Sequence, residues 1–514
     1  MTRALPIIGF ISVMFTFPLV ADWPQFQCDS GNRGYQAAER IATVNRHVFT
    51  TPQGGYGGES WGFTNRYLAG QPVVAGGVVV VASMTGRVFA LSETTGAMAW
   101  SVDVGGPVLN SCAIRDGRVI VATQAGTLTA LHALDGAVLW TYRAGRHGFA
   151  AAPVVDDGVV YIGDKAGRFH AVNAATGQAL WVFETGGASD TGAVRATILC
   201  TAAVLGDGVF FGAENMHAYG LDRATGARLW RRAVTGQSFV HGDPVGSNDE
   251  RAGITVAAGW AVTSAQNGGV VIFRTQPVYA PHWMLDQGEL LIENATGTNW
   301  TGNPLGNTNA WIIEQRAISG ALATNPHLRT FWALHPATGA DKFAQPMPIL
   351  WTGGSGGSAA APVVDDAGGR AWVMARSVYA RIDGGHMVRA YGDLVKLNLN
   401  FDPAIYTNTA QGALGFTYFA CTNPAACSIG FGDVHKVSDE GEILTGAQNA
   451  IMTSTWVSNG GWDVENERTF NVRFYSSDDL GGAPLYGGAV GVVVANGRVI
   501  VRDTSGVKSY VAAE

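Results

Sequence analysis

Residues 157–181 read DGVVYIGDKAGRFHAVNAATGQALW, and this stretch decides the fold. A β-branched and aromatic run at 159–162 is followed by a glycine-containing turn at 165–167 and by a second alternating run at 169–173. A Thr-Gly turn then leads to a run that ends at Trp181. Short β-favouring runs separated by glycine turns predict antiparallel strands joined by hairpins, and we expect four strands in each such unit.

Three other segments repeat this pattern and also end at a tryptophan that follows a Thr-Gly or Asp-Gly pair. The four tryptophans are Trp100, Trp140, Trp181 and Trp230, at steps of 40, 41 and 49 residues. A twisted four-stranded sheet cannot bury both of its faces alone, so units of ~40 residues stack around an axis and cover each other. The sequence therefore predicts an all-β fold, a β-propeller, in which these tryptophans pack between blades and do not form a cofactor site.

The repeat is less regular after Trp230. Thr338 and Gly339 still precede an aromatic residue at the docking position, but that residue is Phe343. Residues 361–365 (APVVD) repeat a string that occurs in the third regular unit, and so mark the start of another unit. We expect eight blades of four antiparallel strands, with seven as the alternative.

The unit at 157–181 resembles the repeat of propellers of the pyrroloquinoline-quinone (PQQ) type. The opening string DWPQFQ at 22–27, with Asn32 and Gly34, is similar to the start of many exported proteins of that class. The resemblance implies that the N-terminal stretch adds a strand to the last blade and closes the ring.

These patterns predict the domain organisation. Residues 22–71 form an N-terminal segment with the ring-closing strand, and residues 72–514 form the propeller. Interruptions near 275–325 and 400–480 are expected to be loops or embellished blades.

The first 21 residues have the form of a cleavable signal peptide. Arg3 is followed by an apolar stretch at 4–20 and by Ala21, before the polar string begins. A membrane anchor is the alternative, but the stretch is shorter than the ~20 apolar residues that span a bilayer, and Pro6 and Pro18 interrupt it. We therefore expect a periplasmic or secreted protein with no membrane span in its mature form.

Net charge and the spacing of the cysteines further restrict the kinds of partner and cofactor that we expect. The formal net charge is −7 and no run of Lys or Arg occurs, so no nucleic-acid partner is expected. Cys421 and Cys427 are separated by a turn with Pro424 and could close a small disulfide loop, with two unlinked thiols as the alternative. The other three cysteines have no predicted partner: Cys28, Cys112 and Cys200. No zinc-site or covalent-haem spacing occurs.

The PQQ-type resemblance also implies a chemistry, because quinoprotein alcohol dehydrogenases hold calcium and PQQ on the propeller axis. Asn299 and Asn303 lie in a string, TGTNWTGNP, similar to the loop that supplies an asparagine ligand in those enzymes. Glu214, in GAEN, is similar to their carboxylate ligand. Oxygen ligands of this kind suit calcium. The alternatives are a surface loop for the two asparagines and an ordinary hairpin turn for Glu214.

The catalytic base of those enzymes has no counterpart here. The string WTGGSGGS at 351–358 contains no carboxylate where the enzymes place acidic residues, and the vicinal cysteine pair is absent. Asp243 could serve as a substitute, but its position before Pro244 is typical of a turn. Abstraction of a proton or hydride from an alcohol requires a positioned base.

Two functions therefore follow from the sequence. The first is a non-catalytic binding or scaffold propeller of the cell envelope, comparable in architecture to the lipoprotein subunit of the outer-membrane barrel-assembly machine, which would hold a protein partner through rim loops and strand edges. The second, the alternative, is a dehydrogenase dependent on PQQ and calcium.

Overall fold

In the computed structural model of the chain, every regular element that is described is a β-strand. The structure describes residues 22–26, 28–33, 59–145, 147–234, 331–342, 491–502 and 506–511, together with the remaining strands whose bounds are given below. The predicted all-β class is confirmed. No helix of sufficient length and apolarity to cross a membrane occurs among the described residues.

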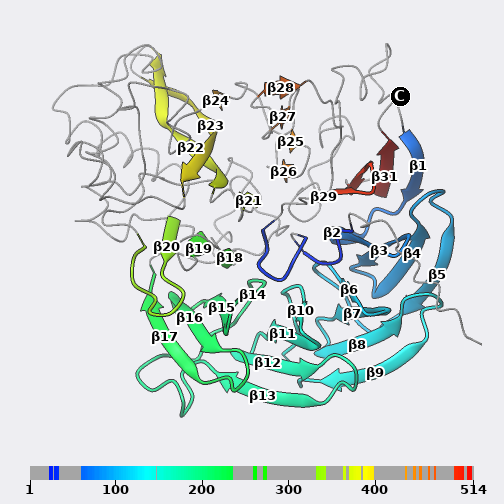
Figure 1. Cartoon of the computed structure of the whole chain (residues 1–514), viewed down its shortest axis with the longest axis horizontal. Coiled ribbons are helices and arrows are strands. Elements are labelled where there is room, and N and C mark those ends of the chain that lie inside the picture. The colour runs from blue at the N-terminus through cyan, green and yellow to red at the C-terminus, as the bar shows by residue number, and fades with distance from the viewer. Residues whose placement is uncertain are drawn as a thin grey trace, which may run out of the picture.

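Four consecutive sheets of four antiparallel strands follow the chain, and each is one blade (Figure 1). Blade 1 is β2 (Leu68–Ala75), β3 (Val78–Ser83), β4 (Arg87–Ser92) and β5 (Met98–Asp103). Blade 2 is β6 (Ala113–Arg115), β7 (Arg118–Ala122), β8 (Thr127–His132) and β9 (Val138–Arg143). Blade 3 is β10 (Val154–Asp156), β11 (Val159–Gly163), β12 (Arg168–Asn173) and β13 (Ala179–Glu184). Blade 4 is β14 (Ala203–Leu205), β15 (Gly208–Ala213), β16 (His217–Asp222) and β17 (Arg228–Ala233).

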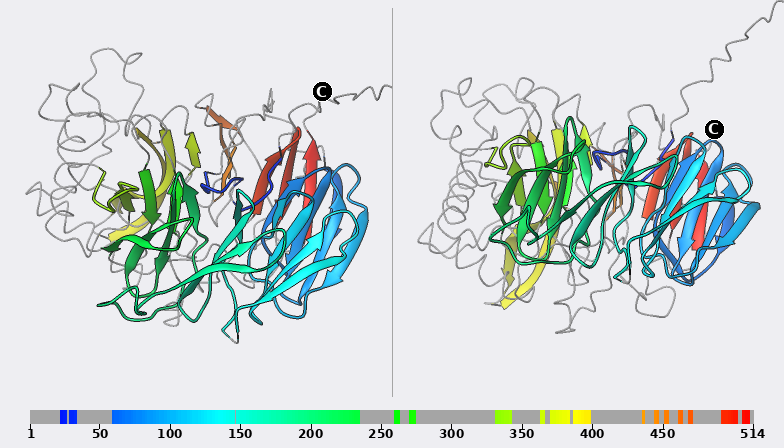
Figure 2. Two further views of the ribbon diagram at one scale, coloured as in Figure 1. Left: turned by 60° about the horizontal axis from the view of Figure 1, so that its bottom comes forward. Right: turned by 90° about the horizontal axis from the view of Figure 1, so that it is seen from below.

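A further four-stranded sheet combines the two ends of the chain. Its strands are β29 (Gly491–Ala495), β30 (Arg498–Arg502), β31 (Gly506–Val511) and, on the outside, β1 (Glu59–Thr64). Strand β1 runs antiparallel to β31, with Gly62 opposite Lys508. Figure 2 shows these red strands packed beside the blue strands of blade 1. The strand that closes the ring is therefore at 59–64.

The described strands of the second half are more varied. Three form one sheet: β18 (Gly259–Val262), β19 (Val270–Arg274) and β20 (Phe331–Leu334). Four form another: β21 (Val363–Asp365), β22 (Arg370–Asp383), β23 (His386–Asn398) and β24 (His435–Lys436). Two hairpins follow: β25 (Leu444–Gly446) with β26 (Ile451–Thr453), and β27 (Gly461–Asp463) with β28 (Arg468–Phe470). The number of blades stays a prediction, because much of this half lies outside the described residues.

Tryptophans join neighbouring blades in one recurring geometry. The indole N–H of a tryptophan on an outer strand donates to a backbone carbonyl of the next blade, and a glycine of the next blade's turn lies against the ring. The donor–acceptor pairs are Trp61 to Glu93 (2.8 Å), Trp100 to Ala133 (2.9 Å), Trp140 to Ala174 (3.0 Å), Trp181 to Arg223 (3.1 Å) and Trp230 to Pro336 (2.6 Å).

Two separate constraints, one on the backbone and one on packing, require glycine in the turn, and Gly177 illustrates both. Its φ of +72° is a conformation that glycine adopts without a steric cost. A Cβ at this position would lie 2.7 Å from two ring carbons of Trp140. The Thr-Gly signature of the sequence thus reflects both the turn and the flat surface that the indole needs.

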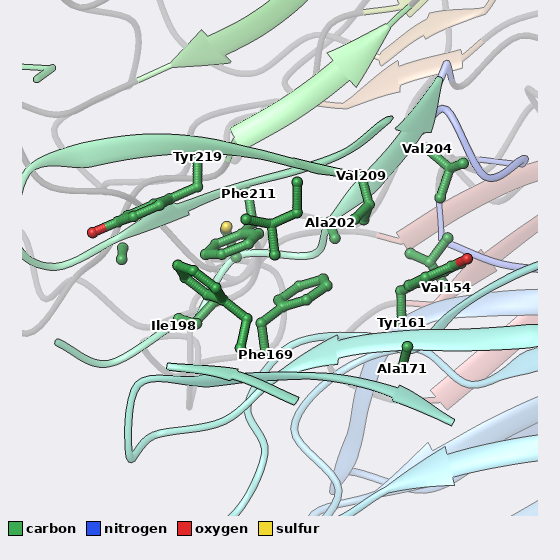
Figure 3. Close-up of a cluster of buried hydrophobic side chains, with 14 residues drawn as sticks. Val154, Tyr161, Phe169, Ala171, Ile198, Ala202, Val204, Val209, Phe211 and Tyr219 are labelled. Atoms are coloured by element: carbon green, nitrogen blue, oxygen red, sulfur yellow. The ribbon is translucent and has the colours of Figure 1, made fainter. Parts of the chain in front are cut away.

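The core between blades 3 and 4 combines aliphatic side chains with stacked aromatic rings (Figure 3). The rings of Phe169 and Phe211 stack with centroids 4.3 Å apart, and Tyr219 stacks on Phe211 at 5.1 Å. All three residues are fully buried. Burial of a side chain of this size stabilises the fold by about 1.5–3 kcal/mol, so contact between blades contributes strongly to holding the ring together.

Candidate functional site

Residues 22–33, which we call the strap, lie across the innermost strands of blades 1 to 4, near the middle of the ring in Figure 1. Trp23 forms a two-way backbone bridge with Val74 of β2, with both N···O distances 2.8 Å. The Ile114 N–H of β6 donates to the Pro24 carbonyl at 2.6 Å.

The strap continues in the same way onto the next two blades. The side-chain oxygen of Gln25 accepts the Val155 N–H of β10 at 2.9 Å. The Val204 N–H of β14 donates to the Ser30 carbonyl at 2.7 Å. Asn32 donates its amide to the Ala202 carbonyl at 2.7 Å. One short peptide therefore satisfies backbone groups of four successive innermost strands.

The position of the strap differs from what the family resemblance implied. The opening string at 22–27 does not extend the last blade, which is completed by β1. Trp23 is fully buried, and its indole donates to the side chain of Gln71 at 3.2 Å. The bonds lie at the end of each innermost strand that leads into a Gly-containing turn, so the strap lies at that end of the four strands.

The loops that enter blades 2, 3 and 4 meet near the axis at their apolar residues. Leu109, Ala150 and Leu199 occupy equivalent positions ahead of β6, β10 and β14, and they pack against one another. Three successive blades therefore share one apolar cluster.

Glu214, the predicted carboxylate ligand, lies in the turn between β15 and β16. Its N–H donates to the Thr197 carbonyl at 3.0 Å, as the N–H of Lys165 donates to Gly148 in the equivalent turn of blade 3. The backbone therefore has the geometry of an ordinary hairpin turn. The side chain is exposed to solvent on one side. Burial of its other side raises the pKa of Glu214, and a hydrogen bond with Thr197 and the charge of Lys165 oppose the rise.

Several predicted residues lie outside the described part of the chain. They are Asp243, Asn299, Asn303, Phe343, Cys421, Cys427 and the string at 351–358. The roles given to them remain predictions. Within the described residues, no three His, Cys, Asp or Glu side chains gather closely enough to hold a metal ion.

A polar chain in blade 3 was not predicted from the sequence. The Tyr142 hydroxyl lies 3.0 Å from Nδ1 of His170, and Nε2 of the same ring lies 3.1 Å from the carboxylate of Asp164. His170 is 1% exposed and Asp164 is fully buried. Burial alone would raise the pKa of Asp164, but hydrogen bonds and charges of His170 and Arg168 outweigh it and lower the pKa.

The repeat does contain a sequence signal for this set of hydrogen-bonded side chains. His170 occupies the place of Phe89 in blade 1, Thr129 in blade 2 and Tyr219 in blade 4, so none of the other regular units has a histidine here. Hydrogen bonds at both ring nitrogens orient His170, and the oriented ring can hold Tyr142 against blade 3. Burial raises the pKa of Tyr142, which makes the phenol a poor nucleophile.

A second buried carboxylate, Asp190, anchors the loop between β13 and β14. It accepts the Gly186 N–H at 2.8 Å, the Tyr219 hydroxyl at 3.1 Å and Arg231 at 2.8 Å, and it also pairs with Arg228. Burial raises the pKa of Asp190, but these hydrogen bonds together lower it below its ordinary value. The group is a structural anchor between the loop and the outer strand of blade 4.

The three described cysteines are buried thiols. Burial raises the pKa of Cys112 to about 12. Cys200 lies against the backbone of Gly212, whose N–H is 3.0 Å from the sulfur. Since the thiolate is the reactive form, Cys112 is unsuited to thiol chemistry.

The radial sheets, the ring-closing strand and the tryptophans between blades define a β-propeller of PQQ-type repeats. A family model described as outer membrane protein assembly factor BamB matches residues 52–181 and 113–345, which together exceed half of the chain. The chain belongs to this family. No curated protein matches it in sequence.

Solved structures of related shape are remote. BamB of Moraxella catarrhalis is 16% identical, with 84% of this chain and 79% of that chain covered and a TM-score of 0.38. The quinohemoprotein alcohol dehydrogenase of Comamonas testosteroni is 13% identical, with 95% and 80% covered and a TM-score of 0.49. The computationally designed Ika8 protein is 12% identical, with 88% and 100% covered and a TM-score of 0.47. Likeness at this level carries no argument about activity or partner.

Proposed function

We propose that the protein is a non-catalytic binding or scaffold module of the cell envelope, exported to the periplasm or secreted. The observation that carries the proposal is the bonding of the protein's own strap to the innermost strands of blades 1 to 4. Leu109, Ala150 and Leu199 also pack together ahead of three of these strands. A propeller whose inner strands hold its own peptide offers its rim and its strand edges for binding.

The competing function is a dehydrogenase that uses PQQ and calcium, held by Glu214, Asn299 and Asn303. Of these three residues, the structure describes Glu214. PQQ carries several carboxylates and calcium prefers oxygen ligands, whereas the cluster of Leu109, Ala150 and Leu199 is aliphatic. The carboxylate of Glu214 could bind calcium. However, the backbone at Glu214 forms the same turn as in blade 3, where Lys165 occupies the equivalent position.

A titration separates the two functions. The purified chain is mixed with PQQ and calcium, and the absorbance of the quinone and the reduction of an artificial acceptor by alcohols are followed. We expect neither binding at micromolar PQQ nor reduction, and the E214Q variant should behave as the unmodified protein does. Saturable binding that E214Q abolishes would overturn the scaffold proposal.

A further inference from the structure

The strap begins in a seam between blade 1 and the closing blade, which consists of β29, β30, β31 and β1. The hydrophobic cluster around Trp23 includes Val74 of blade 1 and Val493 of β29, so three parts of the chain meet there. Trp23 and Val74 exchange backbone hydrogen bonds as an antiparallel pair. Residues of antiparallel chains pair in opposite order. Asp22 therefore lies toward the end of β2 that leads into the turn to β3.

Asn496 joins the strap to blade 1 at this seam. The residue lies in the turn between β29 and β30, and its side-chain amide donates to the carboxylate of Glu93 in blade 1 at 2.9 Å. The same nitrogen lies 3.4 Å from the carboxylate of Asp22. Two carboxylates from separate parts of the chain therefore converge on one neutral amide. Glu93 is 6% exposed, so solvent ions screen its charge only weakly.

Glu93 is an exception among the units. Its backbone carbonyl accepts the indole N–H of Trp61. The residues with the same backbone role in the four other tryptophan contacts are Ala133, Ala174, Arg223 and Pro336. None of these four carries a carboxylate. Docking of a tryptophan uses the carbonyl and not the side chain, so packing between blades does not explain the buried acid. A buried carboxylate is stabilised by a positive charge that donates hydrogen bonds to it.

The predicted processing of the chain creates a positive charge at this place. Cleavage after Ala21 leaves Asp22 as the first residue. The new α-amino group is protonated at neutral pH, because the ordinary pKa of such a group is about 7.7–8.0. Its nitrogen belongs to the same residue as the carboxylate that contacts Asn496, so the ammonium group enters the seam. A longer N-terminus places an uncharged peptide group there instead.

We infer that the seam is a binding site for the chain's own mature N-terminus. The α-ammonium group of Asp22 pairs with the buried carboxylate of Glu93, and this pair fixes the start of the strap once residues 1–21 are removed. The inference rests on the proposed export of the chain, and it gives the cleavage a structural role in completing the ring.

The ionisable groups around the seam allow the pair to be detected by its pH dependence. The strap contributes Asp22 and Cys28, blade 1 contributes Glu93, and the closing blade contributes Arg498. Carboxylates ordinarily titrate near pH 4 and arginine above pH 12. Burial raises the pKa of the Cys28 thiol well above its ordinary value. Among these groups, the α-amino group is therefore the one that changes its charge just above pH 8.

The sign of the effect follows from the pairing. A carboxylate partner raises the pKa of the α-amino group in the folded chain above its unfolded value of about 8. The resulting stability is fully present below the unfolded pKa and is lost as the pH rises through the folded pKa.

The test uses the full chain, exported and processed by its host, and N-terminal sequencing establishes whether it begins at Asp22. Urea unfolding is then measured from pH 7 to pH 10 for this protein, for E93Q and for a chain with Gly-Ser added before Asp22. We expect the urea midpoint of the unmodified protein to fall more steeply above pH 8 than the midpoints of both variants. The matched control is E184Q, which removes an exposed carboxylate of blade 3 and should keep the unmodified profile.

A second measurement reads the amine directly. Acylation of the α-amino group at pH 7, followed by mass spectrometry, should be severalfold faster in E93Q, because loss of the carboxylate lowers the pKa of the amine. E93Q is expected to fold, since glutamine keeps the shape of the side chain and an acceptor for Asn496. The extended chain keeps Glu93 itself and so tests the pair without altering the seam.

Several outcomes would overturn the inference. They are equal pH profiles for the unmodified protein and E93Q, an unmodified profile in the extended chain, the same change in E184Q as in E93Q, or equal acylation rates. Sequencing that finds residues 1–21 still attached would overturn the proposed export itself. Binding of PQQ would overturn the scaffold function without altering the pH profiles, so these failures can be told apart.

Discussion

The contact between a turn glycine and the preceding blade's tryptophan gives the sharpest test of how the ring is held together. Gly177 has a φ of +72° and lies under the ring of Trp140. Gly158, in another turn of the same blade, has a φ of +75°, and a Cβ there would meet nothing within 4 Å. The two glycines therefore share the backbone requirement but not the packing requirement.

The magnitudes follow from this difference. Alanine in a left-handed conformation costs about 1–2 kcal/mol, so G158A should lose about that amount of stability. In G177A the new methyl group would lie 2.7 Å from the indole, and the ring cannot move freely because its N–H is bonded to Ala174. Overpacking costs about 1–3 kcal/mol more. We expect G177A to be less stable than G158A by that second amount.

Urea unfolding measures both variants, and hydrogen exchange in β9 and β13 shows where the loss occurs. Adding W140A should remove most of the extra cost of G177A, because the clash then has no partner, whereas the cost of G158A should be unchanged. Equal destabilisation by G177A and G158A would refute the reasoning, since it would mean that the turn alone explains the glycine.

Three further predictions concern other parts of the molecule. W23A should lose about 3–5 kcal/mol in urea unfolding, because it removes the fully buried side chain that anchors the strap, and faster exchange at the Ile114 and Val204 amides should accompany the loss; unchanged exchange there would contradict the strap's role. Native protein at pH 8 should leave Cys112 unalkylated by iodoacetamide, because the pKa of its thiol is about 12, and labelling by mass spectrometry checks this. The lowered pKa of Asp190 contributes stability that is present above its unfolded pKa of about 4 and is lost as the pH falls through the folded value, so D190N should flatten the fall in urea midpoint below pH 4; an unchanged acid profile would count against it.

The regular half of the ring could be predicted from sequence because its information is local. The pattern that ends at Trp181 contains the turn, the strand and the docking residue within 25 positions. The closing blade could not be located in this way. Trp61 docks in the same manner as the other tryptophans, but its strand pairs with residues more than 440 positions away, and no Thr-Gly pair precedes it.

The axial site was predicted less well, for a related reason. Nothing in the spacing of Trp23, Pro24 and Gln25 indicates that they bond to successive blades. Their partners, Val74, Ile114 and Val155, are separated from one another by a repeat length and from the strap by up to 130 residues. Glu214 was identified from a short string, and its turn could be weighed against the equivalent turn at Lys165. Asn299 and Asn303, which were predicted to bind calcium together with Glu214, lie outside the described residues.

A repeat fold supplies its own internal controls, and these separate packing from function. Positions that agree among the units, such as the docking tryptophans, are explained by the contact between blades. Positions that disagree need another reason. His170 departs from its equivalents in the other blades and lies within hydrogen-bond distance of both Tyr142 of blade 2 and Asp164 of its own blade. Since His170 is buried, a polar contact between blades 2 and 3 explains this departure.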